Sequence, residues 1–292
     1  MIDCHMHLHE SMVSLPGIVA SMDKFGIQRT ALIPRLNPPI YAMPLLLRMT
    51  TPLLRKILYS DGGWLHGLAL KMYESWSRDD GTVLIGLKRY KIIAAPDNTE
   101  VTSALKHYPD RFWGWIFVNP RCSTDPLAEI EKYCHVPGMI GVKAHPYWHN
   151  YPIQELIKTA ELCTENNLPM LIHLGVKQHG DYNFLPSMFP KLKVIYAHAG
   201  VPYGHSVCEL AGEMKNVFID LSSPAYMDIK TAHRAIAKAG ANKCLFGSDG
   251  PYLNTSGDRY DYGPITSIVK ALDLSEDDRA RIERLNFIDI LQ

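Results

Sequence analysis

The sequence predicts a (β/α)8 barrel, the TIM-barrel fold, in which eight parallel strands are each followed by a helix. Short apolar runs rich in valine and isoleucine alternate with amphipathic stretches along most of the chain. Such runs are typical of parallel strands whose two faces are both covered by helices. The 292 residues provide the length for eight such units. No Gly-x-Gly-x-x-Gly follows the first run, which disfavours a dinucleotide-binding doubly wound sheet.

Eight segments fit the strand pattern. They are residues 1–4, 30–34, 111–118, 139–144, 168–174, 192–197, 217–221 and 243–246. Helices are expected between them, for example over 125–134 and 153–166. The last helix is predicted to begin at Ser275, because Asp278 follows three residues later as in a capping box. Its apolar residues recur at helical spacing up to Leu291, so we expect it to pack on the barrel.

Residues 36–95 interrupt the alternation after the second strand and read as a helical insertion in a single domain of residues 1–292. Residues 41–59 and 64–76 are apolar with basic residues interleaved. A βα loop of this length is usually a functional lid or a subunit contact. A helical pair that only extends the core is the alternative. A membrane-surface role is disfavoured, because the chain has zero net charge.

Composition narrows the classes of partner and compartment. Thirty basic residues balance thirty acidic ones, so no overall field attracts nucleic acid or anionic membranes, and we expect neither as a partner. The six cysteines form no Cys-x-x-Cys pair and are expected to be reduced thiols. No secretory signal pattern and no membrane-length apolar run is found. We therefore expect a cytoplasmic protein.

Metal-binding or titratable side chains occur at the ends of five predicted strands, where barrel enzymes have their active sites. His5 and His7 lie on one face of the first strand and converge as a divalent metal requires. A polar turn with surface histidines is the alternative for this stretch taken alone. The other strand ends carry Lys143 and His145, His173, His198, and Asp249. Their joint placement predicts a metal centre.

Six motifs in order point to a known family. They are DCHMH (3–7), GVKAHP (141–146), LPMLIHLG (168–175), VIYAHAG (194–200), NVFIDLSS (216–223) and LFGSDGPY (245–252). With them the chain resembles the amidohydrolase superfamily, in the amidohydrolase-2 branch that includes aminocarboxymuconate-semialdehyde and resorcylate decarboxylases. The resemblance spans almost the whole chain and leaves only the 36–95 insertion outside.

The resemblance implies a ligand set of His5, His7, His173 and Asp249 around one divalent metal. Zinc is favoured, and manganese, iron and cobalt are alternatives, because imidazole and carboxylate serve all of them. Asp249 would also be the base that takes a proton from water. His198 would contact the water or the reacting group in a mononuclear site, or bind a second metal in a binuclear one.

Lys143 leaves the number of metals open. In binuclear relatives a lysine on this strand is carbamylated and bridges two metals, which requires a neutral amine that burial favours. An unmodified Lys143 could instead pair with a substrate carboxylate, and a structural ion pair inside the barrel is a further alternative. We expect His145 and Tyr147 to lie near substrate, with His145 either contacting it or supporting a ligand.

These observations predict a metal-dependent hydrolase that activates water against an amide, ester or lactone carbonyl of a small molecule. The alternative is a metal-dependent, non-oxidative decarboxylase of an unsaturated or aromatic acid. A non-catalytic barrel used as a binding protein is disfavoured, because no expected ligand is missing. The apolar insertion suggests a homodimer.

Overall fold

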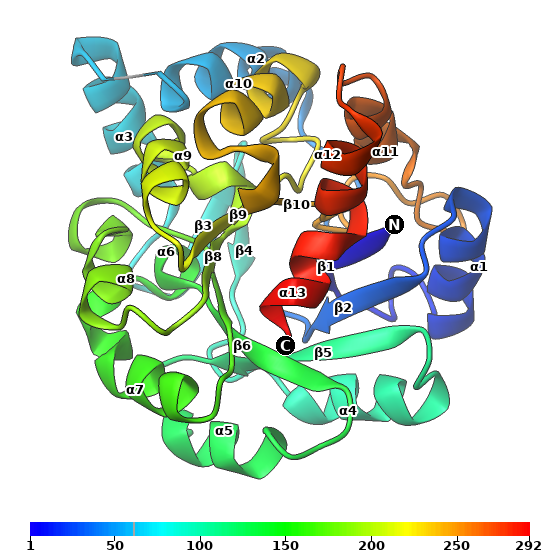
Figure 1. Ribbon diagram of the computed structural model, residues 1–292. Coiled ribbons are helices and arrows are strands. Elements are labelled where there is room, and N and C mark those ends of the chain that lie inside the picture. Colours follow the sequence, from blue (N-terminus) through cyan, green and yellow to red (C-terminus); the bar gives the residue numbers. More distant parts are fainter. Residues whose placement is uncertain (61) are drawn as a thin grey trace.

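The computed structural model describes residues 1–60 and 62–292 (Figure 1). Its main sheet has eight strands in the order β1-β2-β5-β6-β7-β8-β9-β10, and all neighbours are parallel. The bounds are β1 Ile2–His7, β2 Arg29–Ile33, β5 Phe112–Val118, β6 Met139–Ala144, β7 Met170–Ile172, β8 Val194–Tyr196, β9 Val217–Asp220 and β10 Cys244–Leu245. The eight predicted strands are therefore confirmed, with shifts of a few residues at their ends.

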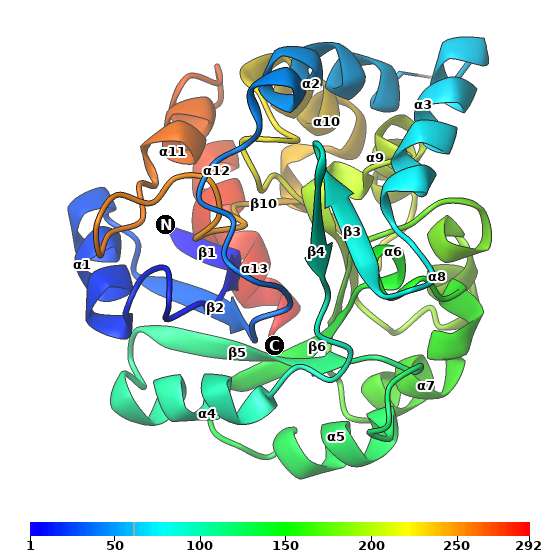
Figure 2. The same cartoon turned by 180° about the vertical axis from the view of Figure 1, so that it is seen from behind.

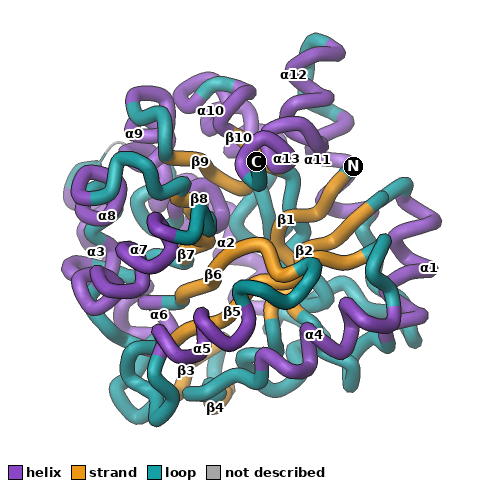
Figure 3. The backbone as a smooth tube through the Cα atoms, turned by 60° about the horizontal axis from the view of Figure 1, so that its bottom comes forward, coloured by secondary structure: helices purple, strands orange, loops and turns teal. Residues whose placement is uncertain are grey.

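Backbone hydrogen bonds join the first strand to the segment that follows the last one. The amide of Cys4 donates to the carbonyl of Phe246 at 3.0 Å, and that of His7 donates to Gly250 at 2.7 Å. The amide of Asp249 donates to the carbonyl of His5 at 2.7 Å. These bonds bring Asp249 beside the histidines of β1 and complete the barrel predicted from the sequence (Figure 3).

Helices surround the sheet, and several begin where the sequence supplies a capping side chain. The Asp97 carboxylate accepts from the amide of Thr99, and the Ser275 hydroxyl accepts from the amide of Asp278, as the predicted capping box requires. The helices along the barrel are α1 Leu15–Phe25, α4 Asn98–His107, α5 Pro126–Tyr133, α6 Pro146–His149, α7 Ile157–Glu165, α8 Phe184–Met188, α9 Gly204–Glu213, α10 Ile229–Ala239, α11 Gly263–Lys270, α12 Glu276–Ala280 and α13 Asn286–Ile290.

The insertion contains the two predicted helices, α2 (Leu45–Leu58) and α3 (Trp64–Trp76). It also contains an antiparallel hairpin, β3 (Thr82–Ile85) and β4 (Lys88–Lys91), which the sequence analysis did not predict. Figure 2 shows α2 and α3 at one edge of the molecule, with the hairpin between α3 and the barrel. No helix among the described residues is long and apolar enough to cross a membrane.

The insertion is tied to the barrel by polar contacts as well as by packing. Arg55 lies 3.6 Å from the carboxylate of Asp228, and the Tyr59 hydroxyl donates to the carbonyl of His198. The Ser77 hydroxyl donates to the carbonyl of Tyr147 at 2.6 Å. Both carbonyls belong to predicted site residues, so the insertion packs directly against the candidate site.

Candidate metal centre

The centre is built where β1 ends and the segment after β10 returns. Asp249 Oδ1 lies 3.6 Å from His5 Nε2 and 3.6 Å from His7 Nε2. Ligands at about 2.0–2.2 Å from a tetrahedral zinc lie roughly 3.4 Å apart, so this spacing fits one shared ion. Two imidazoles and a carboxylate are also a donor set that first-row divalent metals accept. The residues present therefore fit a divalent metal.

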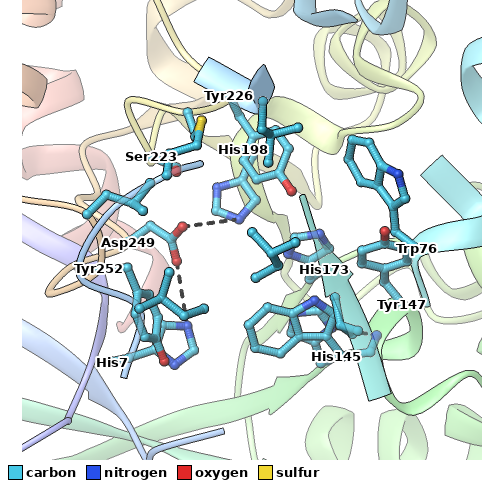
Figure 4. Close-up of a pocket in the computed structure, with 18 of the residues that line it drawn as sticks. His7, Trp76, His145, Tyr147, His173, His198, Ser223, Tyr226, Asp249 and Tyr252 are labelled. Atoms are coloured by element: carbon cyan, nitrogen blue, oxygen red, sulfur yellow. Dashed lines mark hydrogen bonds and ion pairs between the residues drawn. The ribbon is translucent and has the colours of Figure 1, made fainter. Parts of the chain in front are cut away.

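His198 lies on the other side of the same carboxylate. Its Nε2 is 4.0 Å from Asp249 Oδ2, and its ring is stacked on that of His5 with centroids 5.1 Å apart. Figure 4 shows Asp249 between His7 and His198. The structure thus brings three of the predicted site residues together around the carboxylate of a fourth, Asp249.

Asp220 at the end of β9 fixes the orientation of these rings. Its Oδ2 accepts from His5 Nδ1 at 2.8 Å, so His5 Nε2 presents its lone pair toward Asp249. Its Oδ1 accepts from the Ser222 hydroxyl, whose oxygen is 2.8 Å from His198 Nδ1. The hydroxyl has only one proton, so His198 Nδ1 donates to it and His198 Nε2 also presents a lone pair. Both rings are oriented as metal binding requires.

His173, the remaining predicted imidazole ligand, has a different partner. Its Nε2 is hydrogen-bonded to the hydroxyl of Tyr73 at 2.9 Å, and its ring is stacked on His145 with centroids 4.2 Å apart. The ring centroid is 4.8 Å from that of His198, so His173 borders the centre. Its Nε2 can join a metal only after the bond from Tyr73 is released.

Burial sets the charge state of the site. It lowers the pKa of His5, His7, His145 and His173 well below the usual histidine range, and it lowers the pKa of His198 to about 3. The imidazoles are therefore neutral at physiological pH, which is the form that binds metal. Burial also raises the pKa of Asp249 to about 7, and the charge of Lys143 partly offsets this rise.

Lys143 is fully buried inside the barrel at the end of β6. Within the described residues its Nζ has no hydrogen-bond partner. Burial lowers its pKa to about 8, and the carboxylates of Asp220 and Asp249 oppose this shift. The structural ion pair considered for Lys143 is not formed among the described residues. A buried amine that loses its proton this readily fits the chemistry of carbamylation.

A cavity of about 140 Å³ opens over the centre, and His7, His173, His198 and Asp249 form its polar side (Figure 4). Its volume is close to that of an engineered apolar cavity of about 150 Å³ that binds benzene. No arginine or lysine of the described residues lines it. The remaining wall is largely apolar and comes from the insertion and three loops: Ile40, Met43, Leu47, Trp76, Val83, Leu84, Ile85, His145, Tyr147, Trp148, Ser223, Ala225, Tyr226, Tyr252 and Leu253.

The comparison with protein families agrees with this geometry. The family model described as "Amidohydrolase" matches residues 86–290, which is more than two thirds of the chain. The chain belongs to the amidohydrolase family. The resemblance inferred from the sequence motifs is thereby confirmed, and the chain is a member of a family of enzymes. None of the curated proteins matches it.

Three solved structures illustrate the similarity in fold. A probable 2-pyrone-4,6-dicarboxylic acid hydrolase from Acinetobacter baumannii shows 14% identity and a TM-score of 0.61, covering 99% of this chain and 98% of that one. A 5-carboxyvanillate decarboxylase from Sphingomonas paucimobilis shows 14% identity and a TM-score of 0.60, and the match covers 100% of this chain and 98% of that one. A variant 5-carboxyvanillate decarboxylase from Novosphingobium aromaticivorans, with bound manganese, shows 14% identity and a TM-score of 0.57, and the match covers 94% of this chain and 79% of that one. At this identity the likeness shows the fold.

The predicted substrate-side residues of this amidohydrolase occupy different places. His145 and Tyr147 line the cavity, whereas Lys143 does not. His145 Nδ1 accepts from the amide of Trp148 at 3.1 Å, and the Tyr147 hydroxyl donates to the carbonyl of Tyr73 at 2.8 Å. The ring of His145 is stacked on those of His173 and Trp148, with centroids 4.2 and 4.5 Å away, so it borders the cavity within an aromatic stack. Lys143 is fully buried outside the cavity lining.

Four further residues of the site were not predicted from the sequence. Tyr226 is stacked on His198 with centroids 4.8 Å apart, and Tyr252 lies 5.2 Å from the ring of His7. The Tyr73 hydroxyl is hydrogen-bonded to His173, and the Asp220 carboxylate is hydrogen-bonded to His5. Asp220 ends a strand, and the same rule that singled out Asp249 would have found it.

The backbone around the centre is strained. His198, Ser223 and Asp249 have φ of 54°, 66° and 58°, in the left-handed region that side chains rarely adopt. Each such residue costs roughly 1–3 kcal/mol and persists only where the surrounding structure imposes it. All three line the cavity, so the strain is concentrated at the candidate site.

Proposed function

We propose that the chain is a metal-dependent hydrolase that acts on an amide, ester or lactone carbonyl of a small and largely apolar molecule. One observation carries this proposal. The Asp249 carboxylate lies between the imidazoles of His5 and His7 on one side and His198 on the other, beneath an apolar cavity. Family membership supports an enzymatic role.

The residues expected to hold the divalent metal are His5, His7 and Asp249, with His173 joining when Tyr73 releases it. Three imidazoles and a carboxylate favour zinc, and the manganese bound by one structural neighbour makes manganese the next candidate. When bound, the metal supplies Lewis acidity toward water and toward the substrate carbonyl oxygen.

The side chains around the metal position have separate roles in proton transfer and substrate binding. Asp249 accepts a proton from water at a carboxylate oxygen, and its pKa, which burial raises to about 7, suits a base at neutral pH. His198 presents an Nε2 lone pair 4.0 Å from the same carboxylate and can accept a hydrogen bond from the water, which orients it. Tyr147, Trp148 and Tyr226 line the cavity, where they exclude water and orient an apolar ring.

We further propose that Lys143 forms a carbamate, which would allow a second metal to bind between it and His198. The neutral Nζ adds to the carbon of carbon dioxide, and one proton leaves to water. The support is the complete burial of Lys143, its lack of a hydrogen-bond partner among the described residues, and the lowering of its pKa to about 8. We retain the cytoplasm as the compartment, supported by six free cysteines.

Decarboxylation is the second candidate, and a specific observation favours it. Two of the structural neighbours are decarboxylases of aromatic acids, and the cavity here has the volume for one aromatic ring. An unmodified Lys143 with one metal would fit this reaction.

The test is a parallel assay of the metal-loaded protein. Aryl esters, lactones and anilides are assayed for hydrolysis, and hydroxybenzoic acids are assayed for release of carbon dioxide. The proposal expects hydrolysis that a chelator abolishes and that Asp249→Asn lowers by at least about 100-fold. Release of carbon dioxide without hydrolysis would replace it with the second candidate. Activity that survives metal removal would refute both.

A further inference from the structure

The outward side of the insertion is an exposed apolar surface, which we call the α2–α3 face. It consists of Leu45, Met49, Leu53, Trp64, Leu65, Leu68 and Met72. Leu45, Met49 and Leu53 recur every four residues and so lie along one side of α2. Of the eleven large hydrophobic side chains that are exposed among the described residues, nine belong to residues 41–87. Apolar surface concentrated in this way marks a binding surface.

The charged residues of α2 and α3 are mostly basic. Arg48, Lys56 and Lys71 are exposed. The one acidic residue among the described residues of these helices, Glu74, is partly exposed and is paired with Lys177 at 3.1 Å. Residues 36–95 contain eight lysines and arginines against four acidic residues, a net charge of +4. The remainder of the chain contains 22 basic and 26 acidic residues, so the charge is separated within a neutral protein.

The opposite sides of the two helices are already packed. Leu58 and Tyr59 of the α2 end are buried, and Arg55 pairs with Asp228. Ala69 and Tyr73 of α3 are buried as well. The helices are therefore fixed on the barrel by their inner sides, and the α2–α3 face points away from these contacts.

The apolar surface continues onto the β3–β4 hairpin. Leu87 at its turn is 95% exposed, and Lys88 and Arg89 follow it. The neighbouring Gly86 lies so close to Pro44 that an added Cβ would come within 2.7 Å of it, which places the turn beside the start of α2. The turn thus adds one apolar and two basic side chains near the start of α2.

We propose that the α2–α3 face binds the surface of an anionic lipid bilayer. Apolar side chains flanked by lysine and arginine, with few acidic residues, are the features by which amphipathic helices bind such surfaces. Trp64 is 78% exposed, and tryptophan favours the boundary between lipid and water. Attachment is peripheral, since none of the described helices can span a membrane.

A second copy of the chain fits this face less well. The cores of protein interfaces are depleted in lysine. A symmetric dimer would bring the Lys56 and Lys71 of one copy against those of the other. Zero net charge over the whole chain does not disfavour membrane binding here, because the charge is separated and residues 36–95 are basic.

The proposal does not depend on the reaction that the metal centre performs. It does place the cavity beside the bilayer, because Met43 and Leu47 line the cavity from the same segment that carries the α2–α3 face. Apolar substrates dissolved in the bilayer would then reach the cavity over a short path.

Sedimentation with lipid vesicles tests the proposal on the full-length protein. Vesicles of phosphatidylcholine with phosphatidylglycerol are compared with vesicles of phosphatidylcholine alone. We expect the wild type to sediment with the anionic vesicles, and binding to weaken at high salt. Met72→Glu and Trp64→Glu should each lower binding roughly tenfold or more. Lys71→Ala should lower it about fivefold, the effect of one cation at an anionic surface.

Met188→Glu is the matched control. Met188 lies in α8 outside the insertion and is 49% exposed, close to the 43% of Met72. We expect it to bind vesicles as the wild type does. Circular dichroism confirms that each variant is folded. The proposal fails if the folded wild type stays in solution with anionic vesicles, or if Met188→Glu reduces binding as much as Met72→Glu. A dimer that Met72→Glu dissociates and that binds no vesicles would assign the face to a second copy.

Discussion

Tyr73 is expected to weaken metal binding, and Tyr73→Phe tests this directly. Its hydroxyl, carried by the insertion, is hydrogen-bonded to His173 Nε2 at 2.9 Å, on the nitrogen that the metal would use. A metal bound to this nitrogen displaces the hydrogen bond, because Nε2 has one lone pair. Removing the hydroxyl therefore destabilises the metal-free state and leaves the metal-bound state unchanged.

The size of the effect follows from the bond that is lost. A buried hydrogen bond contributes about 1 kcal/mol net. Since 1.4 kcal/mol corresponds to a factor of ten, Tyr73→Phe should tighten metal binding about fivefold. The metal-free variant should also lose about 1 kcal/mol in free energy of unfolding. Titration of the metal-free protein against a competing chromophoric chelator measures the affinity, and denaturant unfolding measures the stability.

Tyr147→Phe is the control for this experiment. The Tyr147 hydroxyl is also buried and donates to the backbone carbonyl of Tyr73 at 2.8 Å, so its loss should cost similar stability. It contacts no predicted ligand nitrogen, so metal affinity should not change. The reasoning is refuted if Tyr73→Phe binds metal with the affinity of the wild type or less tightly.

Three further predictions concern positioning and stability. Asp220→Asn should weaken metal binding about 10- to 100-fold, because the carboxylate that orients His5 is lost; unchanged affinity in the same titration would contradict this. Trp115→Ala should lower the free energy of unfolding by about 3–5 kcal/mol, because Trp115 is fully buried and its indole donates to the carbonyl of Cys4 at 2.9 Å. Asp97→Ala should lower it by about 0.5–2 kcal/mol through loss of a helix cap, without affecting metal content.

The sequence predicts the barrel well because its strands are buried on both faces. Runs such as Met170–Ile172 and Val194–Tyr196 are apolar and buried throughout, as expected for parallel strands covered on both faces. The β3–β4 hairpin shows where this signal fails. Residues 88–91 are mostly charged and exposed, so they lack the pattern of a buried strand, and only the pairing with β3 makes them one.

The part of the candidate site that lies at strand ends could be predicted from the sequence, whereas the part that depends on the insertion could not. His5 and His7 lie at the end of β1, and His198 and Asp249 follow other strands of the same parallel barrel, so topology alone brings them to one rim. Tyr73 lies 100 residues from His173 in a long insertion, and no local pattern determines which way such a helix packs. The orientation of His173 depends on that packing, and it therefore could not be predicted.

The central claim is that the β1 histidines and Asp249 hold a divalent metal and that Lys143 completes a second site. Metal content per chain tests it most directly, measured for wild type and Lys143→Ala prepared with bicarbonate and without chelator. We predict two ions per chain in the wild type and one or none in the variant. One ion in both would leave Lys143 unmodified and favour decarboxylation. A folded wild type that retains no metal would contradict the account.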